Sequence, residues 1–282
     1  MALTRIAGAV LLTLALAQSG VAQEVKSGSE AFTPNVGQPG KDVIWVPTPG
    51  ALITRMLTMA KVTPGDHVID LGSGDGRIAI AAGKEFGATA LGVEYNADMV
   101  ALSQRSAREA GVADKVQFVK GDIFATDFGK ATVITMYLLP QLNLRLRPTI
   151  LSMRPGTRVA SHAFTMGEWE PDEQATVENR TAYLWIVPAK VDGRWAFRQS
   201  GGEGGFEVEL GQTFQKLSGQ VVLPGGARAP ASGALRGDAL TLTFRDDKNV
   251  ERSLTGRVQG NQITASLPSG EGGGAQWVGV RK

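Results

Sequence analysis

Residues 68–77, with the sequence VIDLGSGDGR, decide the fold of this 282-residue chain. The stretch opens with apolar residues around a single acid, as a buried parallel strand does, and continues with alternating glycines. Glycine lets the backbone turn sharply and approach a ligand, because it has no Cβ to clash. A helical pattern starts at Arg77. The stretch therefore predicts a strand, a tight turn and a helix, and open parallel sheets bind ligands at such turns.

The spacing of the glycines distinguishes two kinds of ligand. A dinucleotide fingerprint would need glycine at position 77, which is arginine, and the third glycine is instead Gly76. Asp70, two residues before Gly72, would repel a pyrophosphate and suits a ligand with a positively charged, amino-acid-like part. The pattern Asp70-x-Gly72-x-Gly74-x-Gly76 resembles motif I of the class I S-adenosylmethionine-dependent methyltransferases. The alternative is a glycine turn that serves packing alone.

Two further acids follow the next strands of the pattern. Glu94 ends the second expected strand, where a carboxylate accepts hydrogen bonds from ribose hydroxyls, a feature that NAD sites share. Asp122 follows the third strand, and the resemblance implies that it meets the adenine amino group while Ile123 lines the ring. Each acid could instead cap a helix or a turn. Three acids at three strand ends nevertheless predict one S-adenosylmethionine site.

Strand-like and helix-like segments alternate over the first part of the chain. Strands are expected at 67–71, 89–93, 116–119, 131–136 and 158–162, and helices at 51–61, 77–86, 97–110 and 141–153. Such alternation predicts an α/β, doubly wound, Rossmann-like sheet, and the resemblance implies seven strands. Segments 181–191 and 194–198 flank Asp192-Gly193, which predicts a hairpin completing that sheet.

The last third of the chain has no helical period. Residues 232–241 and 255–264 echo each other, each with a Gly-Asp or Gly-Asn turn, and a weaker third copy is expected from Ser218. This pattern predicts a small all-β antiparallel meander or barrel. The expected domains are therefore 43–199 for the α/β part and 206–282 for the β part, separated at Gly201–Gly205.

The N-terminal residues predict export. Arg5 precedes an apolar run at 6–17 that is too short to span a bilayer, and small-residue cleavage patterns follow. Residues 1–22 are therefore expected to be a signal peptide and 23–42 a flexible leader, with a periplasmic location and no transmembrane span beyond the signal peptide. The alternative is an uncleaved N-terminus that anchors the protein to a membrane.

Composition excludes several kinds of site. The chain has no cysteine, which rules out disulfides, thiolate metal centres and a cysteine nucleophile, and its two histidines provide little for a metal site, so no metal is expected. A net charge of +2 does not call for nucleic acid as a partner.

Other segments point to one family within these methyltransferases. VPTP at 46–49, YLLP at 137–140 and PGTRVASH at 155–162 accompany motif I. Together they are similar to the family of the ATP synthase c-subunit lysine methyltransferases and their prokaryotic relatives, over about residues 42–190.

The segment after the fourth strand bears on the methyl acceptor. Enzymes that methylate amide or base nitrogens carry Asn/Asp-Pro-Pro-Tyr there, and this chain has Tyr137-Leu-Leu-Pro140 instead. A lysine acceptor, with a reference pKa near 10.4, has to lose a proton, which an apolar aromatic slot favours. Tyr137 and Pro140 are therefore catalytic candidates, with His162 as a proton relay. The pocket candidates are Trp45, Thr48 and Trp169, although the aromatic residues could serve core packing.

These observations favour an S-adenosylmethionine-dependent enzyme that N-methylates a protein lysine. Export is at odds with a cofactor made in the cytoplasm, so two alternatives stay open. One is an exported small-molecule methyltransferase, and the other a non-catalytic scaffold that binds an adenosine ligand or a protein.

Overall fold

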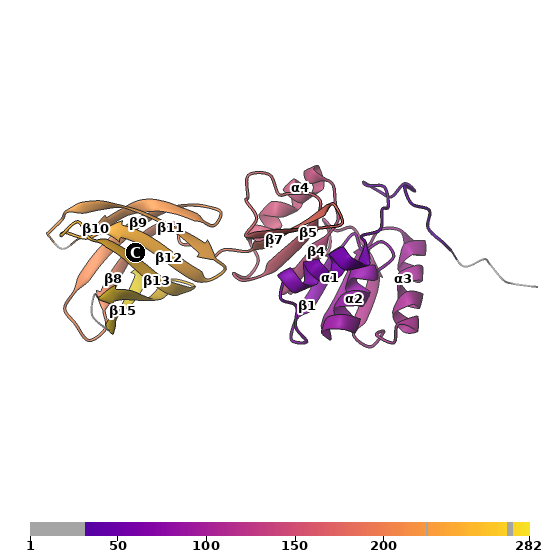
Figure 1. Cartoon of the computed structure of the whole chain (residues 1–282), viewed down its shortest axis with the longest axis horizontal. Coiled ribbons are helices and arrows are strands. Elements are labelled where there is room, and N and C mark those ends of the chain that lie inside the picture. Colours follow the sequence, from indigo (N-terminus) through magenta and orange to yellow (C-terminus); the bar gives the residue numbers. More distant parts are fainter. Residues whose placement is uncertain (1–31, 224, 270–272) are drawn as a thin grey trace, which may run out of the picture. The chain divides into compact units, whose positions relative to one another are not determined.

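The computed structural model describes residues 32–223, 225–269 and 273–282 (Figure 1). The predicted signal peptide at 1–22 and the first part of the predicted leader lie outside these residues. Within the described part of the chain, no helix combines the length and the apolar character that crossing a bilayer requires.

The α/β part is a seven-stranded sheet with the order β3-β2-β1-β4-β5-β7-β6. Strands β1 to β5 run parallel to one another, β7 is antiparallel to β5, and β6 is antiparallel to β7. The predicted doubly wound methyltransferase fold is thereby confirmed. Its strands are β1 (His67–Leu71), β2 (Thr89–Glu94), β3 (Val116–Lys120), β4 (Val133–Met136), β5 (Arg158–His162), β6 (Glu173–Val177) and β7 (Arg180–Ile186).

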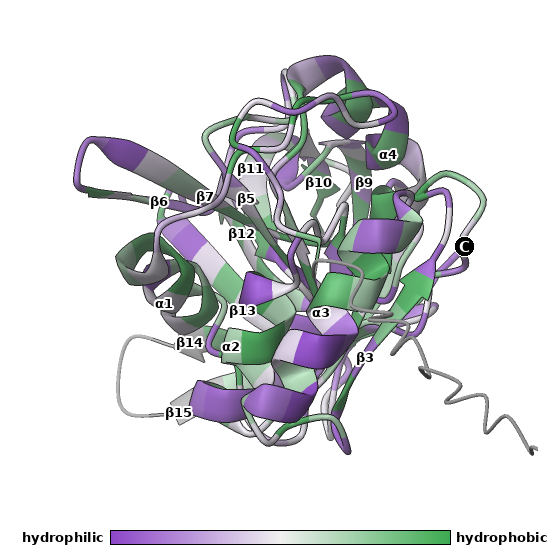
Figure 2. Ribbon diagram, turned by 90° about the vertical axis from the view of Figure 1, so that its right-hand side faces the viewer, coloured by the Kyte–Doolittle hydropathy of each residue, from purple (hydrophilic) through white to green (hydrophobic). Residues whose placement is uncertain are grey.

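Helices cover both faces of this sheet and create two cores. Buried residues of α1 (Gly50–Met59), α2 (Arg77–Phe86) and α3 (Ala97–Glu109) pack with alternate strand residues such as Val68. Buried residues of α4 (Pro140–Leu151) pack with the opposite face, which includes Ile69. Successive strand residues point to opposite faces, so the apolar run at 68–71 supplies both cores. Figure 2 shows hydrophobic colouring on the strands and on parts of the helices.

The hairpin predicted around Asp192-Gly193 is wrong. Strand β7 pairs with β6 across the turn Glu178-Asn179, whose two residues have φ of 49° and 60°, as the two-residue turns of hairpins require. The strand after Asp192 is β8 (Gly193–Gln199), and it pairs with β9 and β15 of the second sheet. The α/β sheet is therefore complete at Ile186, and the predicted boundary at 199–206 is one strand too late.

The β part is a closed antiparallel barrel, which confirms the prediction of a small all-β domain. Its interior is filled by buried apolar side chains, among them Trp195, Phe197 and Leu242. The strands after β8 are β9 (Gly205–Thr213), β10 (Lys216–Val222), β11 (Arg228–Arg236), β12 (Ala239–Arg245), β13 (Glu251–Gln259), β14 (Gln262–Ser269) and β15 (Gly273–Arg281).

The barrel repeats its hairpins every 23 residues. The turns fall at residues 214–215, 237–238 and 260–261, and the same backbone bond follows each of them: Leu235 N to Gln215 O at 2.8 Å, Val258 N to Asp238 O at 2.9 Å and Arg281 N to Asn261 O at 3.0 Å. The predicted echo of 232–241 and 255–264 contains two of these turns. Its third copy surrounds residue 214, so the expectation that it starts at Ser218 is wrong.

Candidate functional site

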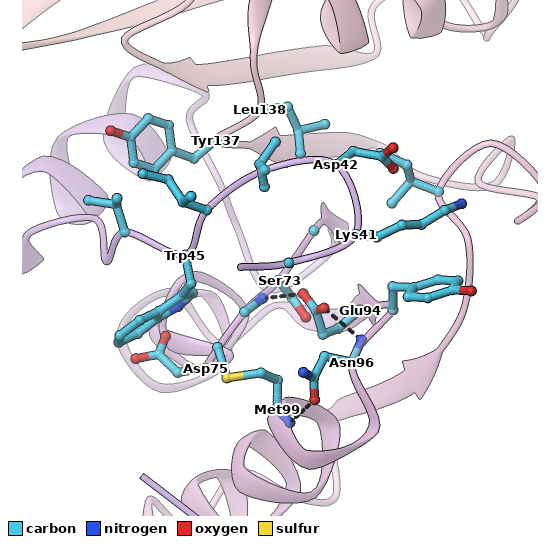
Figure 3. Close-up of a pocket in the computed structure, with 18 of the residues that line it drawn as sticks. Lys41, Asp42, Trp45, Ser73, Asp75, Glu94, Asn96, Met99, Tyr137 and Leu138 are labelled. Atoms are coloured by element: carbon cyan, nitrogen blue, oxygen red, sulfur yellow. Dashed lines mark hydrogen bonds between the residues drawn. The ribbon is translucent and has the colours of Figure 1, made fainter. Parts of the chain in front are cut away.

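A cavity of about 660 Å³ opens at the carboxyl ends of the parallel strands (Figure 3). Its lining comes from 38–48, from the glycine turn after β1, from the ends of β1, β2, β3 and β4, from the first turns of α2, α3 and α4, and from Phe164. The structure thus brings the three predicted acids and Ile123 together, as strand ends at one edge of a parallel sheet require. Trp45, Thr48 and Tyr137 also line the cavity.

The glycine turn is possible only because its glycines lack side chains. Gly72, Gly74 and Gly76 have φ of 75°, 55° and 81°, the region that other residues rarely adopt. A Cβ on Gly74 would lie 2.8 Å from Nε1 of Trp45, and one on Gly76 would lie 2.6 Å from the ring of Phe118. The turn is therefore pressed closely between its neighbours.

Asp70 is a buried carboxylate with one unused oxygen. The Thr135 hydroxyl donates to Oδ1 at 2.7 Å, whereas Oδ2 has no hydrogen-bond partner among the described residues. Burial raises the pKa of Asp70 to about 7, against the lowering effect of Thr135 and with the support of the nearby charges of Asp75 and Glu94. The buried hydroxyl of Ser73, which lines the same cavity, is also without a partner in the described structure. These two polar atoms fit a ligand that carries an ammonium group.

Glu94 already accepts two backbone hydrogen bonds. Its Oε2 accepts from the amide of Gly74 and its Oε1 from the amide of Asn96, both at 2.9 Å. Each carboxylate oxygen can accept a further bond. Glu94 therefore fixes the glycine turn and keeps the capacity to accept the two ribose hydroxyls that the sequence predicts.

Asp122 is paired with a residue that the sequence did not single out. Its Oδ2 lies 2.7 Å from Nζ of Lys41, and its Oδ1 accepts from the amide of Phe124 at 2.9 Å. The hydrogen bond from Lys41 is the main cause that holds the pKa of Asp122 below its usual value. The Lys41 ammonium also lies 4.7 Å from the centre of the Tyr95 ring.

Residues 37–45 form a strap beside the cavity. Gly37 N donates to Trp45 O at 2.8 Å, Trp45 N donates to Gln38 O at 2.9 Å, and Gly40 N donates to Val43 O at 2.8 Å. The last part of the predicted leader, 37–42, therefore belongs to a hydrogen-bonded turn that lines the site. Two of the backbone hydrogen bonds of this turn are made with Trp45, which follows the predicted leader in the sequence.

His162 lies behind Tyr137. The two ring centres are 3.8 Å apart, and the imidazole Nδ1 is 3.0 Å from the Thr48 hydroxyl. His162 is 1% exposed, and burial, helped by the charge of Arg180, lowers its pKa to about 4. The ring is therefore neutral near pH 7 and does not line the cavity.

Two other candidates lie outside the site. Pro140 is exposed at the first position of α4 and does not line the cavity. Trp169 is fully buried in the core, where its ring centre is 6.2 Å from that of Trp185 and its carbonyl accepts from Trp185 Nε1 at 2.7 Å. The expectation that Trp169 lines a substrate pocket is therefore wrong.

Sequence reasoning missed several lining residues. Lys41 and Phe164 are the most informative, together with Asp75, which makes an ion pair with Arg77 at 2.6 Å. Arg77 in turn donates to the carbonyl of Thr48 at 3.2 Å and ties VPTP to motif I. The signal for Phe164 was its place two residues after the fifth strand. Within the described ranges, no three His, Asp or Glu side chains gather as a metal site would require.

Comparison with known proteins agrees with this geometry. The family model of the ANTKMT methyltransferase domain matches residues 70–173. A protein-lysine N-methyltransferase of Saccharolobus islandicus (strain REY15A) is 42% identical over 151 residues, which cover 51% of this chain and 94% of the relative. An ATP synthase c-subunit lysine N-methyltransferase of Mus musculus is 30% identical over 147 residues, which cover 52% of this chain and 59% of that enzyme.

A solved structure is similar to about the same share of the chain. A crystal structure of an RNA methyltransferase from Salinibacter ruber in complex with S-adenosyl-L-homocysteine has 47% sequence identity and a TM-score of 0.51, and it covers 52% of this chain and 96% of that one. S-adenosyl-L-homocysteine carries an ammonium group and ribose hydroxyls. The former suits the unpaired oxygens of Asp70 and Ser73, and the latter suit the free acceptor positions of Glu94. S-adenosylmethionine, when bound, supplies a methyl group on a positively charged sulfur. The chain belongs to the class I S-adenosylmethionine-dependent methyltransferases, in the family of the protein-lysine and ATP synthase c-subunit lysine N-methyltransferases.

Proposed function

We propose that this methyltransferase N-methylates a lysine side chain of a protein. The proposal rests on one observation: the cavity has an acidic wall and a separate apolar wall. Acids come from the ends of β1, β2 and β3, whereas the wall after β4 consists of Tyr137, Leu138, Leu139 and Leu142, with Phe164 beside them. This second wall holds no charged side chain, and its Tyr137 belongs to the segment after β4 that bears on the methyl acceptor.

An apolar wall is suited to an amine acceptor. Lysine has a reference pKa near 10.4, and transfer into an apolar environment favours its neutral, nucleophilic form. The proton leaves before the attack, a nitrogen–carbon bond then forms, and the methyl–sulfur bond breaks. Tyr137, Leu138 and Phe164 exclude water and hold the amine in line. Alignment of this kind accounts for much of the rate of such transfers.

His162 does not act as the base in this proposal. Its pKa of about 4 makes it a weak proton acceptor at neutral pH, and Tyr137 covers it. Its contact with Thr48 supports the wall from behind. The proton is instead released to water as the lysine enters the apolar site.

The test is transfer of a labelled methyl group. Purified protein is incubated with tritiated S-adenosylmethionine and with separate protein, RNA and small-molecule fractions of the source cells. We expect label in the protein fraction, as methyl-lysine after acid hydrolysis, with the site mapped by mass spectrometry. Tyr137→Ala should reduce the label at least about tenfold while S-adenosylhomocysteine still binds, because loss of alignment costs up to about a hundredfold in rate.

Each other outcome identifies a different function. Label in RNA would favour the activity named for the Salinibacter relative, against which the YLLP segment argues because it lacks the Asn/Asp-Pro-Pro-Tyr pattern. Label in the small-molecule fraction would favour an exported small-molecule methyltransferase. Binding of S-adenosylhomocysteine with no transfer in any fraction would favour the non-catalytic scaffold.

We also infer that the protein is exported to the periplasm. The support is the basic, apolar and small-residue pattern of residues 1–22. N-terminal sequencing of the protein from fractionated cells should find a start at Gln18 or Gln23 in the periplasmic fraction. An intact Met1 in the cytoplasmic fraction would overturn the inference, and an intact Met1 in the membrane fraction would favour the anchor.

A further inference from the structure

The loop after β5 carries an aromatic side chain to the cavity in an unusual backbone conformation. Ala163 has a φ of 64°, and Gly167 has a φ of 65°. Between them, Phe164 lines the cavity, with its ring centre 6.0 Å from that of Tyr137 and a 25° angle between the planes. Residues other than glycine rarely adopt this left-handed region, because Cβ comes too close to the following carbonyl oxygen. Such a conformation persists only where the surroundings hold the loop in place.

Side chains hold three consecutive carbonyls of this loop. Asn143 Nδ2 donates to Phe164 O at 3.3 Å and to Thr165 O at 3.2 Å. The Ser161 hydroxyl donates to Phe164 O at 2.8 Å, and Arg147 Nη1 donates to Met166 O at 2.9 Å. Loop carbonyls of this kind usually bond to water or to backbone amides. Here they are fixed by a side-chain clamp, Asn143 and Arg147, with Ser161 in support.

Asn143 holds the loop through its side-chain amide nitrogen. It is fully buried on α4, on the side of the helix that also buries Leu142 and Leu146. A buried amide is costly unless it is hydrogen-bonded. The only partners of its Nδ2 in the described structure are the two loop carbonyls, and its buried Oδ1 has no partner there. Arg147 lies four residues later, so both side chains project from the same helix face.

We propose that Asn143 and Arg147 are positioning residues for the methyl acceptor. By fixing the carbonyls of residues 164–166, they set Phe164 beside Tyr137 and so define the apolar wall that receives the acceptor. Neither residue lines the cavity. The proposal rests on the proposed function, because it assumes that the acceptor lies against this wall. Both residues lie on α4, which begins at Pro140, directly after the Tyr137-Leu138-Leu139 part of the wall.

The clamp is tested first without any acceptor. The chain has three tyrosines, so protein labelled with 3-fluorotyrosine gives three fluorine resonances, and Tyr137→Phe identifies that of Tyr137. Asn143→Leu removes both amide donors at similar volume, and Arg147→Met removes the guanidinium. We expect each variant to shift or broaden the Tyr137 resonance and to leave those of Tyr95 and Tyr183 unchanged.

The matched control is Thr149→Ala, an exposed position on the same helix. It should change none of the three resonances. S-adenosylhomocysteine affinity, measured by calorimetry, should stay within about twofold of wild type in all variants, since Asn143 and Arg147 do not line the cavity. If Asn143→Leu does not fold, two other variants take its place: Arg147→Met, and Ala163→Gly, which lets residue 163 leave the left-handed conformation. Each is read by the fluorine resonance of Tyr137.

Transfer activity then separates the two proposals. In the labelled-methyl assay, both clamp variants should lose at least about tenfold in methyl-lysine formation, because misplacement of about 1 Å can cost about a hundredfold. A Tyr137 resonance that is unchanged in folded clamp variants overturns the positioning role, as does full activity in both. If wild type forms no methyl-lysine, the proposed function fails, and a shifted Tyr137 resonance would still report the clamp.

Discussion

Asp70 links cofactor binding to pH. Burial raises the pKa of its carboxyl group to about 7, so this group gains and loses a proton around neutral pH. A ligand ammonium beside Oδ2 stabilises the carboxylate, so binding should release that proton. We expect the affinity for S-adenosylhomocysteine to rise about tenfold between pH 6 and pH 8, the change in the ionised fraction of a group with this pKa.

Calorimetry in two buffers of different ionisation enthalpy measures the released proton directly. Asp70→Asn keeps the shape and removes the titration, so its affinity should be weaker and independent of pH over this range. Proton release that persists in Asp70→Asn would assign the effect to another group.

Glu94 should matter to the glycine turn as well as to the ribose. Glu94→Ala removes the acceptor for the amides of Gly74 and Asn96 together with the expected ribose contacts. Hydrogen bonds to a charged group contribute about 1.5–3 kcal/mol, so the affinity for S-adenosylhomocysteine should fall at least about tenfold. Glu94→Gln retains the shape and should lose less. Calorimetry that finds wild-type affinity in a folded Glu94→Ala protein would leave Glu94 a purely structural role.

His162 should make the protein sensitive to mild acid. Its pKa is about 4 when folded and near 6.5 when unfolded, so only the unfolded state takes up a proton between these values. Stability from this group is complete above about pH 6.5 and is lost as the pH falls toward 4, by up to about 3 kcal/mol. Asp70 contributes with the opposite sign over this range, because its raised pKa lets the folded state take up a proton. The test is therefore urea unfolding of wild type and His162→Phe side by side at pH 7.5 and 4.5. On going to pH 4.5 the variant should gain stability relative to wild type, and a wild-type-to-variant difference that is equal at the two pH values would contradict the assignment.

At the scale of elements, strand ends and glycine turns were predictable from the sequence because they depend on local chemistry. Asp70, Glu94 and Asp122 meet because parallel strands must end at one edge. Strand β6 was not predicted, since it is short and half-exposed and its turn uses Glu178-Asn179 without glycine. Lys41, Phe164 and Trp169 take their places through contacts distant in sequence, which local patterns do not encode.

The barrel hairpins depend on glycines at close strand approaches. A Cβ on Gly233 would lie 2.2 Å from Thr241 O of the neighbouring strand, whereas one on Gly211 would find nothing closer than 3.6 Å. Gly233→Ala should therefore lower the unfolding free energy by about 1–3 kcal/mol, as overpacking does. Gly211→Ala should change it little. Chemical denaturation of both variants makes the comparison, and equal effects would show that the strands can move apart freely.

At the scale of the whole molecule, the position of β8 determines where the chain can be cut. Trp195 and Phe197 of this strand are buried in the barrel interior, and among the described strands β8 pairs only with β9 and β15. A fragment of residues 24–199 keeps β8 without its partners and exposes both rings. Such an open apolar edge promotes aggregation.

We therefore expect residues 24–188 to be soluble and to bind S-adenosylhomocysteine, and residues 24–199 to aggregate. Light scattering measures the aggregation of each fragment, and calorimetry measures its affinity for S-adenosylhomocysteine. Aggregation of the shorter fragment as well would mean that the α/β sheet needs the barrel for its stability.

The pairing of β8 with β15 gives the barrel a property useful in protein engineering. Lys282 N donates to Arg194 O at 2.9 Å, so the backbone enters and leaves the barrel side by side. A cassette with adjacent entry and exit points can be spliced into a surface loop of an unrelated host without stretching that loop. Because its hairpins recur every 23 residues, the same cassette offers equivalent loops at which it could be opened by circular permutation, each leaving the closed sheet intact.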